Sequence, residues 1–230
     1  MLLEVNNLYK KFNNKKVLED ISFTLQKGKV LGILGPNGKG KTTLLNSIYG
    51  FIKVDKGSIK IDGNNVGIET KKIVSYLQDK AYYPKKMTIQ GAIDFYSSFF
   101  DDFKINKMDE LLIEMNLKKE EYIRNLSKGM TEKLFLSLAL SRNSKLFLLD
   151  EPISGVDPVA REKIINSIIN NISEESSMII TTHYVGELEN IFDEVIFIGE
   201  DGIVEMGDAE DLRIKYNSSI DGIYRKVFAE

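Results

Sequence analysis

Cysteine is absent from the 230 residues of this chain. A chain without thiols forms neither a disulfide framework nor a zinc site built on thiolates. Stabilisation by disulfides or by a thiolate zinc site is therefore excluded. We expect the chain to fold and work in a reducing compartment such as the cytosol.

Long hydrophobic runs are also absent. The longest apolar stretch extends from Leu134 to Leu140 and is already interrupted by Ser137, whereas a membrane-spanning helix needs about 18 to 20 apolar residues. The first residues reach an acidic side chain at Glu4 and lack the basic and apolar regions of a secretion signal. We expect this chain neither to carry a secretion signal nor to cross a bilayer by itself.

The chain has no large excess of charge of either sign. Its 31 Lys and Arg residues stand against 34 Asp and Glu residues, a formal net charge of -3. This balance argues against a generally cationic nucleic-acid-binding protein, so no nucleic-acid partner is expected. With 43% hydrophobic and 28% charged residues, the composition is that of one large folded domain with a sizeable core.

Two kinds of strand pattern are present. Alternating segments predict a small, mostly antiparallel β subdomain near the N-terminus: they are Leu2–Val5, Ile21–Leu25 and Ser58–Ile61. Continuous apolar runs are typical of strands buried on both faces: they are Val30–Leu34, Leu146–Leu149, Met178–Ile180 and Val195–Ile198. Because helix-length segments separate these runs, we predict an α/β fold with a mostly parallel central sheet.

The pattern from Thr88 to about Leu117 is helical and rich in aromatic residues, notably between Phe95 and Phe103. We predict a helical subdomain over about residues 81–140, inserted into a catalytic core formed by residues 1–80 and 141–230, all within a single domain. An aromatic stripe on a helix is either core or, where exposed, a surface for a partner. The sequence favours core but leaves both interpretations open.

A phosphate-binding motif follows the apolar run that ends at Leu34. It matches GxxxxGK[ST] between a strand and a helix, and its residues are Gly35, Pro36, Asn37, Gly38, Lys39, Gly40, Lys41, Thr42 and Thr43. The glycines let backbone NH groups face a phosphate, Lys41 neutralises the β and γ phosphates, and the Thr42 hydroxyl can ligate Mg²⁺. The motif predicts a P-loop NTPase that binds a nucleoside triphosphate, with Lys39 more consistent with a solvated loop lysine than with a second phosphate contact.

Two adjacent acids, Asp150 and Glu151, follow the apolar run at Leu146–Leu149. An acid delivered by a buried strand completes a phosphate-loop ATPase, so we expect Asp150 to hold Mg²⁺. Glu151 is then the candidate base for the water that attacks the γ phosphate. A helix start with a second potential anion site lies at Leu126–Met130, where Ser127 can cap the helix and Gly129 permits close approach.

The order of these motifs resembles the ATP-binding cassette (ABC) transporter family over essentially the whole chain. The family's signature sequence resembles Leu126–Met130, its D-loop resembles Ser154-Gly155-Val156-Asp157, and its switch histidine resembles His183, the single histidine of the chain. By the same resemblance an aromatic residue stacks on adenine: Phe12, with Tyr9 as the competitor.

Two departures from the family pattern stand out. The signature has Lys128 and Met130 where Gly and Gln are usual, although Ser127 and Gly129 are retained. The Q-loop pattern is shifted, so that either Gln78 or Asp79 fills the position of the family's glutamine. The resemblance implies a residue near Mg²⁺ at this position, and we take Gln78 as a candidate metal ligand beside Thr42 and Asp150.

The resemblance implies an ATPase, with ATP and Mg²⁺ as cofactors, that works as a pair of cassettes. Each ATP would be bound by Lys41 of one chain and by Ser127 and Gly129 of the other, and closure would assemble Glu151, His183 and Asp157 around the γ phosphate. It further implies a separate membrane-spanning subunit, a location on the cytoplasmic face of the cell membrane, and most closely the exporters of antibiotics, antimicrobial peptides or lipophilic molecules. The alternatives are an importer, or a soluble ABC ATPase acting on nucleic acid, ribosomes or assembly partners. A nucleotide kinase or GTPase is disfavoured, because it needs neither the Ser127 motif nor His183.

Overall fold

A computed structural model of the chain describes residues 1–13, 15–79, 83–84, 86–154 and 156–229. The first sheet has the strand order β2-β1-β4-β5 and is antiparallel throughout. Its strands are β1 (Leu3–Phe12), β2 (Lys15–Leu25), β4 (Lys56–Ile61) and β5 (Asn64–Asn65). The predicted N-terminal antiparallel sheet is therefore confirmed, with β1 and β2 longer than predicted.

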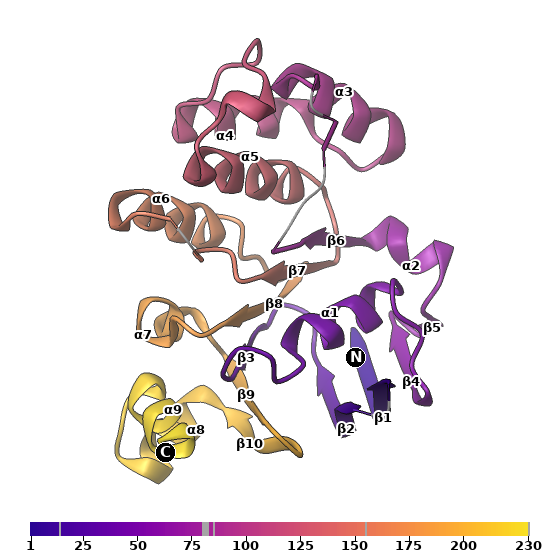
Figure 1. Cartoon of the computed structure of the whole chain (residues 1–230), viewed down its shortest axis with the longest axis vertical. Helices are drawn as coiled ribbons and strands as arrows, with labels where there is room; N and C mark the ends of the chain where they lie inside the picture. Colours follow the sequence, from indigo (N-terminus) through magenta and orange to yellow (C-terminus); the bar gives the residue numbers. More distant parts are fainter. Residues whose placement is uncertain (14, 80–82, 85, 155, 230) are drawn as a thin grey trace.

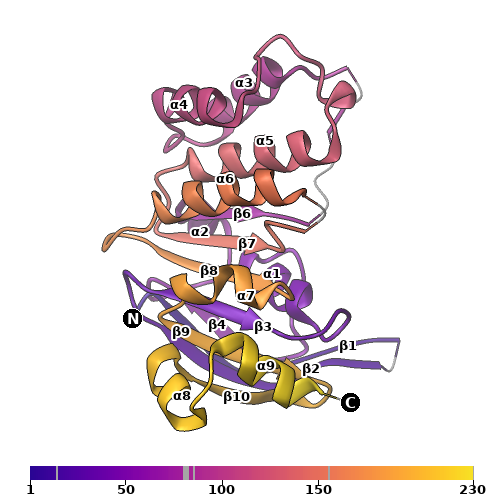
Figure 2. The same ribbon diagram turned by 90° about the vertical axis from the view of Figure 1, so that its left-hand side faces the viewer.

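The second sheet has six strands in the order β10-β9-β3-β8-β7-β6. They are β3 (Val30–Leu34), β6 (Val74–Leu77), β7 (Leu146–Asp150), β8 (Ser177–Thr182), β9 (Glu194–Gly199) and β10 (Gly202–Asp208). All pairs are parallel except that of β9 with β10. The predicted mostly parallel central sheet is confirmed, and the carboxyl ends of its parallel strands meet at one edge, on the right-hand side of Figure 2.

Helices surround and extend this sheet. Those associated with the two sheets are α1 (Lys41–Tyr49), α2 (Ile68–Ile73), α6 (Pro158–Ile169), α7 (Val185–Leu188), α8 (Ala209–Tyr216) and α9 (Ile220–Phe228), with a short 3₁₀ turn at Glu189–Ile191. A separate group of helices forms one end of the molecule (Figure 1): α3 (Ile89–Phe99), α4 (Ile105–Met115) and α5 (Lys128–Leu140), with a 3₁₀ turn at Ile123–Asn125. None of the helices among the described residues is long and apolar enough to span a membrane.

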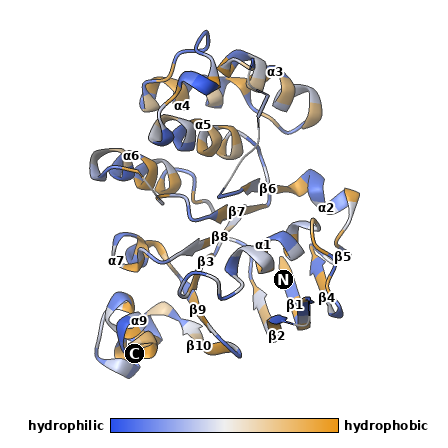
Figure 3. Ribbon diagram, in the orientation of Figure 1, coloured by the Kyte–Doolittle hydropathy of each residue, from blue (hydrophilic) through white to orange (hydrophobic). Residues whose placement is uncertain are grey.

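The central sheet is buried on both faces, because neighbouring residues of its strands enter two different cores. Along β3, Val30 and Leu34 belong to the core shared with the helical end, whereas Leu31 and Ile33 belong to the core shared with β1, β2 and α1. The central strands are accordingly apolar along their length, and the helices show one apolar and one polar side (Figure 3). This explains why continuous apolar runs predicted these strands.

Arg142 connects the helical end to the central sheet. Its guanidinium is buried and pairs with Asp102, with 2.9 Å between Nε and Oδ1. It also donates to the carbonyls of Val74 (2.6 Å) and Lys72 (2.7 Å) and lies 3.9 Å from the ring centroid of Phe100. One side chain therefore joins the segment after α5 to the ends of α2 and α3.

Candidate active site

The phosphate-binding loop connects β3 to α1. Gly38 and Gly40 have φ angles of 80° and 95°, a left-handed conformation that glycine adopts without a steric penalty. Gly40 is the N-cap of α1 and no side chain caps this helix. The NH groups of the first turn of α1 therefore remain available for an anion, and the helix dipole favours negative charge there.

Close backbone approach explains two of the glycines in this loop. A Cβ atom on Gly35 would lie 2.4 Å from the carbonyl oxygen of Ile198, and one on Gly40 would lie 2.6 Å from that of Val17. Both distances are far below van der Waals contact with rigid backbone. The loop is thus pressed against β9 and β2, which fixes its position.

Lys41 starts α1 and points back into the loop. Its side chain is only 6% exposed, and its Nζ donates to the carbonyls of Gly35 (2.7 Å) and Pro36 (3.3 Å). The same Nζ lies 3.3 Å from Glu151 Oε1. The ammonium is therefore held over the loop by backbone dipoles and by the carboxylate that follows β7.

Asp150 ends β7 and is almost fully buried. Its Oδ1 accepts from the Thr181 hydroxyl at 2.6 Å, while Oδ2 has no hydrogen-bond partner among the described residues. Burial raises the pKa of this carboxyl, and hydrogen bonds from the Thr181 and Thr42 hydroxyls act in the opposite direction. A buried carboxylate oxygen without a partner beside a threonine hydroxyl fits a Mg²⁺ ion, which usually takes one or two protein ligands and substrate phosphates.

Glu151 directly follows β7, and Thr181 and His183 hold its backbone and its side chain. Its φ angle is 51°. Positive φ angles are uncommon for residues other than glycine, and residues with such backbone conformations are concentrated at functional sites. Its backbone NH donates to the carbonyl of Thr181 at 3.0 Å. Its Oε2 lies 2.9 Å from His183 Nδ1 and accepts from the His183 NH at 3.3 Å. The carboxylate thus lies between Lys41 and His183.

One cavity joins these groups. It is lined by Val17, Asn37, Gly38, Gly40, Lys41, Thr42, Thr43, Asp79, Glu151, Ser154 and His183. Residues from five separate stretches of sequence therefore meet at the carboxyl edge of the central sheet. A polyphosphate bound by Lys41 and α1 would lie beside Asp150, Glu151 and His183, which is the arrangement that hydrolysis of a nucleoside triphosphate requires.

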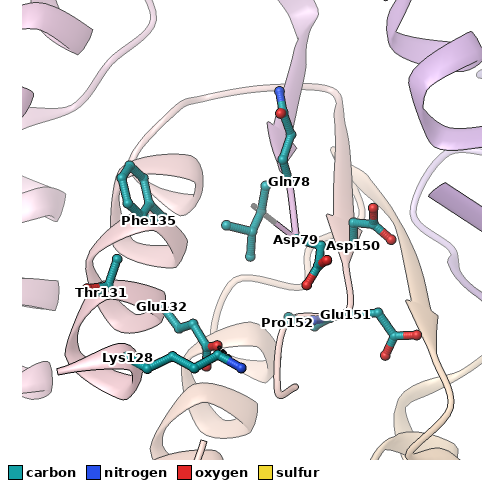
Figure 4. Close-up of a pocket in the computed structure, with 10 residues that line it drawn as sticks. Gln78, Asp79, Lys128, Thr131, Glu132, Phe135, Asp150, Glu151 and Pro152 are labelled. Atoms are coloured by element: carbon teal, nitrogen blue, oxygen red, sulfur yellow. Dashed lines mark ion pairs between the residues drawn. The ribbon is translucent and has the colours of Figure 1, made fainter. Parts of the chain in front are cut away.

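Of the two Q-loop candidates, the structure brings Asp79 and not Gln78 into this cavity. Gln78 instead lines an aromatic groove beside Tyr83 and Phe135. Figure 4 shows the Gln78 side chain pointing away from Asp150 and Glu151, whereas the Asp79 side chain lies beside Asp150. Both residues follow the end of β6, and both line a second pocket together with Asp150 and Glu151, but only Asp79 also lines the phosphate-loop cavity. The geometry thus disfavours Gln78 as a metal ligand and favours Asp79 for the Q-loop position.

Ser127 caps α5 as predicted, because its hydroxyl accepts from the Met130 NH at 3.2 Å. Neither Ser127 nor Gly129 lines the phosphate-loop cavity of its own chain. A Cβ atom on Gly129 would lie 3.3 Å from a methyl of Val156, so the signature helix packs directly on the D-loop. The signature residues are therefore positioned apart from Lys41, and their contact with ATP stays a prediction.

The D-loop leads into α6. Asp157 caps that helix by accepting from the Ala160 NH at 3.0 Å, and it does not line the phosphate-loop cavity. Gly155, the second residue of the predicted D-loop, lies outside the described residues. The capping role accounts for an acid at position 157 independently of nucleotide, and its part in ATP binding stays a prediction.

The two candidates for adenine stacking lie on β1. Phe12 is 44% exposed and pairs with Lys15 of β2, the strand against which the phosphate loop packs. Tyr9 pairs instead with Lys56 of β4, on the other side of β1. Position and exposure thus favour Phe12, while stacking itself stays a prediction.

Lys39 lies outside the site, as predicted, whereas Thr181 belongs to it without having been predicted. Lys39 does not line the cavity and lies 3.5 Å from the exposed carboxylate of Glu200, as expected of a solvated loop lysine. Thr181 is a site residue that the sequence alone did not reveal. In the sequence, Thr181 is marked only by its position two residues before His183. Its hydrogen bond to Asp150 requires that β7 and β8 are neighbouring strands, because their pairing places Thr181 opposite Asp150.

Comparison with known proteins agrees with this geometry. A family model described as "ABC transporter" matches residues 18–154. The chain is 30% identical over 222 residues to the ABC transporter ATP-binding protein YtrB of Bacillus subtilis, covering 94% of this chain and 75% of that protein. It is 28% identical to the lipopolysaccharide export system ATP-binding protein LptB of Haemophilus influenzae, with 92% of each covered. It is 29% identical to the linearmycin resistance ATP-binding protein LnrL of Bacillus subtilis, covering 92% and 70%.

Solved structures support the fold. A structure of an ATP-binding subunit of an ABC transporter superimposes with a TM-score of 0.88 at 23% identity, covering 99% of both chains. A nucleotide-free ATP-binding cassette superimposes with a TM-score of 0.80, also at 23% identity, covering 100% of this chain and 99% of the other. At such identities the likeness shows that the chain has this fold.

Proposed function

This chain belongs to the ABC transporter family as one of its ATP-binding, ATP-hydrolysing subunits, and from that premise we propose that it drives export through a separate membrane-spanning subunit. The observation that carries the ATPase chemistry is the single cavity that unites Lys41, Glu151 and His183. ATP-binding subunits of this family work with a membrane-spanning subunit. We place this one on the cytoplasmic face of the cell membrane.

The direction of transport is supported by two relatives. LptB is named for lipopolysaccharide export and LnrL for linearmycin resistance. Export is outward transport, and resistance to a compound is consistent with its removal from the cell. We extend the outward direction to this chain, whose length matches LptB closely because each covers 92% of the other.

The chemistry at the cavity follows from the positions of its groups. Lys41 and the free NH groups of α1 bind the phosphates of ATP and neutralise their charge. Thr42 and Asp150 would hold Mg²⁺, which supplies charge neutralisation at the β and γ phosphates. Glu151 orients the attacking water and accepts its proton. His183 keeps the Glu151 carboxylate in place through the contact at 2.9 Å.

A second cassette would complete the site. Ser127 caps the start of α5 and Gly129 lies in its first turn, and neither residue lines the phosphate-loop cavity of the same chain. An anion-binding helix start without a ligand in its own chain fits a phosphate presented by a partner. We propose that two cassettes enclose two ATP molecules and that Ser127, Gly129 and Asp157 contact the nucleotide bound by the other cassette.

The groove beside the Q-loop fits the membrane subunit. It is lined by apolar and aromatic side chains between β6 and α3, among them Tyr76, Tyr83, Met87, Phe95, Tyr96 and Phe135. Gln78 also lines it, directly next to Asp79 in the ATP cavity. A partner helix seated there would therefore touch the residue beside the catalytic cavity, which links docking to ATP hydrolysis.

The aromatic residues of α3 and of the segment that follows it are consistent with both of the uses that the sequence allowed. Phe103 is buried in the core, at 8% exposure, whereas Phe95 and Phe99 are 50% and 69% exposed. The rings of Phe95 and Phe99 lie 4.8 Å apart and form one apolar surface. Clustered exposed aromatics of this kind are typical of protein interaction sites.

The proposal is tested by isolating the chain from membranes. A tagged Glu151→Gln form, extracted from native cells in mild detergent with ATP, should co-purify with a stoichiometric multi-spanning protein identified by mass spectrometry. The matched variant carries Phe95→Ser and Phe99→Ser, which should abolish co-purification without affecting ATP binding, because both side chains are exposed. Recovery of ribosomal, nucleic-acid or assembly partners without a membrane protein would refute the transport proposal and leave the ATPase intact.

A further inference from the structure

A continuous series of contacts connects the D-loop to the switch histidine. It begins at Arg161 on α6, whose Nε donates to the carbonyl of Val156 at 2.8 Å. The guanidinium carbon of the same residue lies 4.5 Å from the ring centroid of Tyr184, and Nη1 pairs with Glu187 on α7. A single side chain therefore contacts the D-loop, the residue after the histidine, and α7.

The series continues from Tyr184 to the catalytic cavity. The ring centroids of His183 and Tyr184 lie 4.1 Å apart, slightly closer than the roughly 4.5–7 Å of most aromatic pairs. His183 Nδ1 in turn lies 2.9 Å from Glu151 Oε2. The order of contacts is thus Val156, Arg161, Tyr184, His183 and Glu151.

We propose that Arg161 is a positioning residue for ATP hydrolysis: through the Tyr184 ring it holds His183 against Glu151 and ties this alignment to the conformation of the D-loop. The inference rests on the proposed roles of Glu151 and His183. Arginine suits this task because its planar guanidinium can stack on an aromatic ring while its NH groups hydrogen-bond in the plane. Lysine offers a compact ammonium that cannot do both.

The alternative is that Arg161 only forms an ion pair with Glu187 between α6 and α7. Such a pair would require neither the hydrogen bond to the Val156 carbonyl nor the contact with the Tyr184 ring. Glu187 is 37% exposed, and an ion pair of this exposure contributes little to stability. By contrast, the Arg161 side chain is 19% exposed and aims its Nε at a backbone carbonyl of the D-loop. Gly129 of the signature helix also packs on Val156, so Arg161 links the segment proposed to contact the second cassette with the base at Glu151.

The single histidine of the chain gives a direct structural test. In a proton NMR spectrum of the full chain, the imidazole resonances belong to His183 without further assignment. Arg161→Gln and Tyr184→Leu should both shift these resonances, because the ring current of Tyr184 is moved or removed, whereas Arg161→Lys should give a smaller shift. Lys163→Gln on the exposed side of the same helix removes an equal charge and should leave them unchanged. Unchanged His183 resonances in Arg161→Gln would overturn the proposal.

The kinetic test is a double-mutant cycle on ATP hydrolysis, measured in single turnover so that slow variants remain measurable. Arg161→Gln should lower the rate about tenfold, since small displacements of aligned groups cost at least this much, with KM for ATP within about twofold. In the His183→Ala background the same substitution should have no further effect. An equal loss in both backgrounds would overturn the role of Arg161 alone. If His183→Ala hydrolyses ATP normally, the proposed role of His183 and this inference both fall.

Discussion

The ammonium of Lys41 lies 3.3 Å from Glu151 Oε1, so the residue proposed to bind phosphate is paired with the candidate base. Both side chains are at most 10% exposed, where ion pairs are screened little by solvent. An incoming γ phosphate must therefore compete with Glu151 for Lys41. We expect this competition to free the Glu151 carboxylate for water when ATP binds.

Replacing Glu151 by Gln should separate binding from hydrolysis. We expect the hydrolysis rate to fall at least about 100-fold, as when a general base is removed. ATP should bind several-fold more tightly, because Lys41 no longer pairs with a carboxylate. Phosphate release and equilibrium binding of a fluorescent ATP analogue measure the two effects. Glu162→Gln, an exposed neighbour on α6, is the control, and unchanged hydrolysis in Glu151→Gln would exclude it as the base.

Asp79→Asn should raise the affinity for MgATP, because Asp79 places a negative charge in the same cavity as the phosphates. A single charge at several ångströms in a solvated cleft corresponds to about a threefold change in affinity. The gain should shrink as salt is added, since screening weakens the repulsion. Gln78→Ala is the control, because Gln78 lines the neighbouring groove. An equal effect of both variants would contradict the assignment of Asp79 to the cavity.

The central sheet could be predicted from sequence because its strands are buried on both faces and read as apolar runs. The strand β1 was predicted only as far as Val5, because its alternation is broken after Asn6. Asn7 has a φ angle of 47°, and the pairing with β2 shifts in register between Val5 and Leu8. Such a bulge reverses the faces of the residues that follow, so a strict period of two ends there although the strand continues.

The residues of the site also differ in whether a local sequence pattern predicts them. Lys41, Asp150 and Glu151 are predictable because each belongs to a contiguous motif with its own strand or helix. Thr181 and Arg161 depend on which strands and helices become neighbours, which no local pattern encodes. The choice between Gln78 and Asp79 depends on the direction in which one peptide leaves β6.

Arg142→Met should destabilise the fold strongly. The substitution removes the guanidinium donors from the Asp102 carboxylate and from the carbonyls of Val74 and Lys72, and breaking a buried ion pair costs about 3–5 kcal/mol. Urea unfolding followed by circular dichroism measures the loss. Arg225→Met removes an exposed arginine from its pair with Asp221 and should cost at most about 1 kcal/mol. Similar losses in the two variants would show that Arg142 does not hold the helical end to the sheet.

Glu132→Gln should stabilise the nucleotide-free chain at neutral pH, with a gain that disappears in acid. Burial raises the pKa of Glu132; Lys128 acts in the opposite direction, and the negative charge of Asp79 adds to the increase. Its Oε2 has no hydrogen-bond partner among the described residues. A carboxyl whose pKa is higher in the folded than in the unfolded chain binds more protons when folded, so the free energy of unfolding falls as pH rises between the two values.

At neutral pH the wild-type chain therefore carries the full cost of a buried carboxylate, and the amide does not. The Gln variant also gives up the ion pair with the exposed Lys128 side chain at 3.7 Å, but a pair four residues apart along a helix contributes only about 0.3–0.5 kcal/mol. We expect a net gain of at most about 1 kcal/mol, or roughly 2–4 °C in Tm for a domain of this size. Melting curves from pH 7.5 down to about 4, near the unfolded pKa of glutamate, should converge with the wild type. Lys128→Met measures the ion pair separately, and a gain that persists unchanged in acid would mean that charge burial at Glu132 is not its cause.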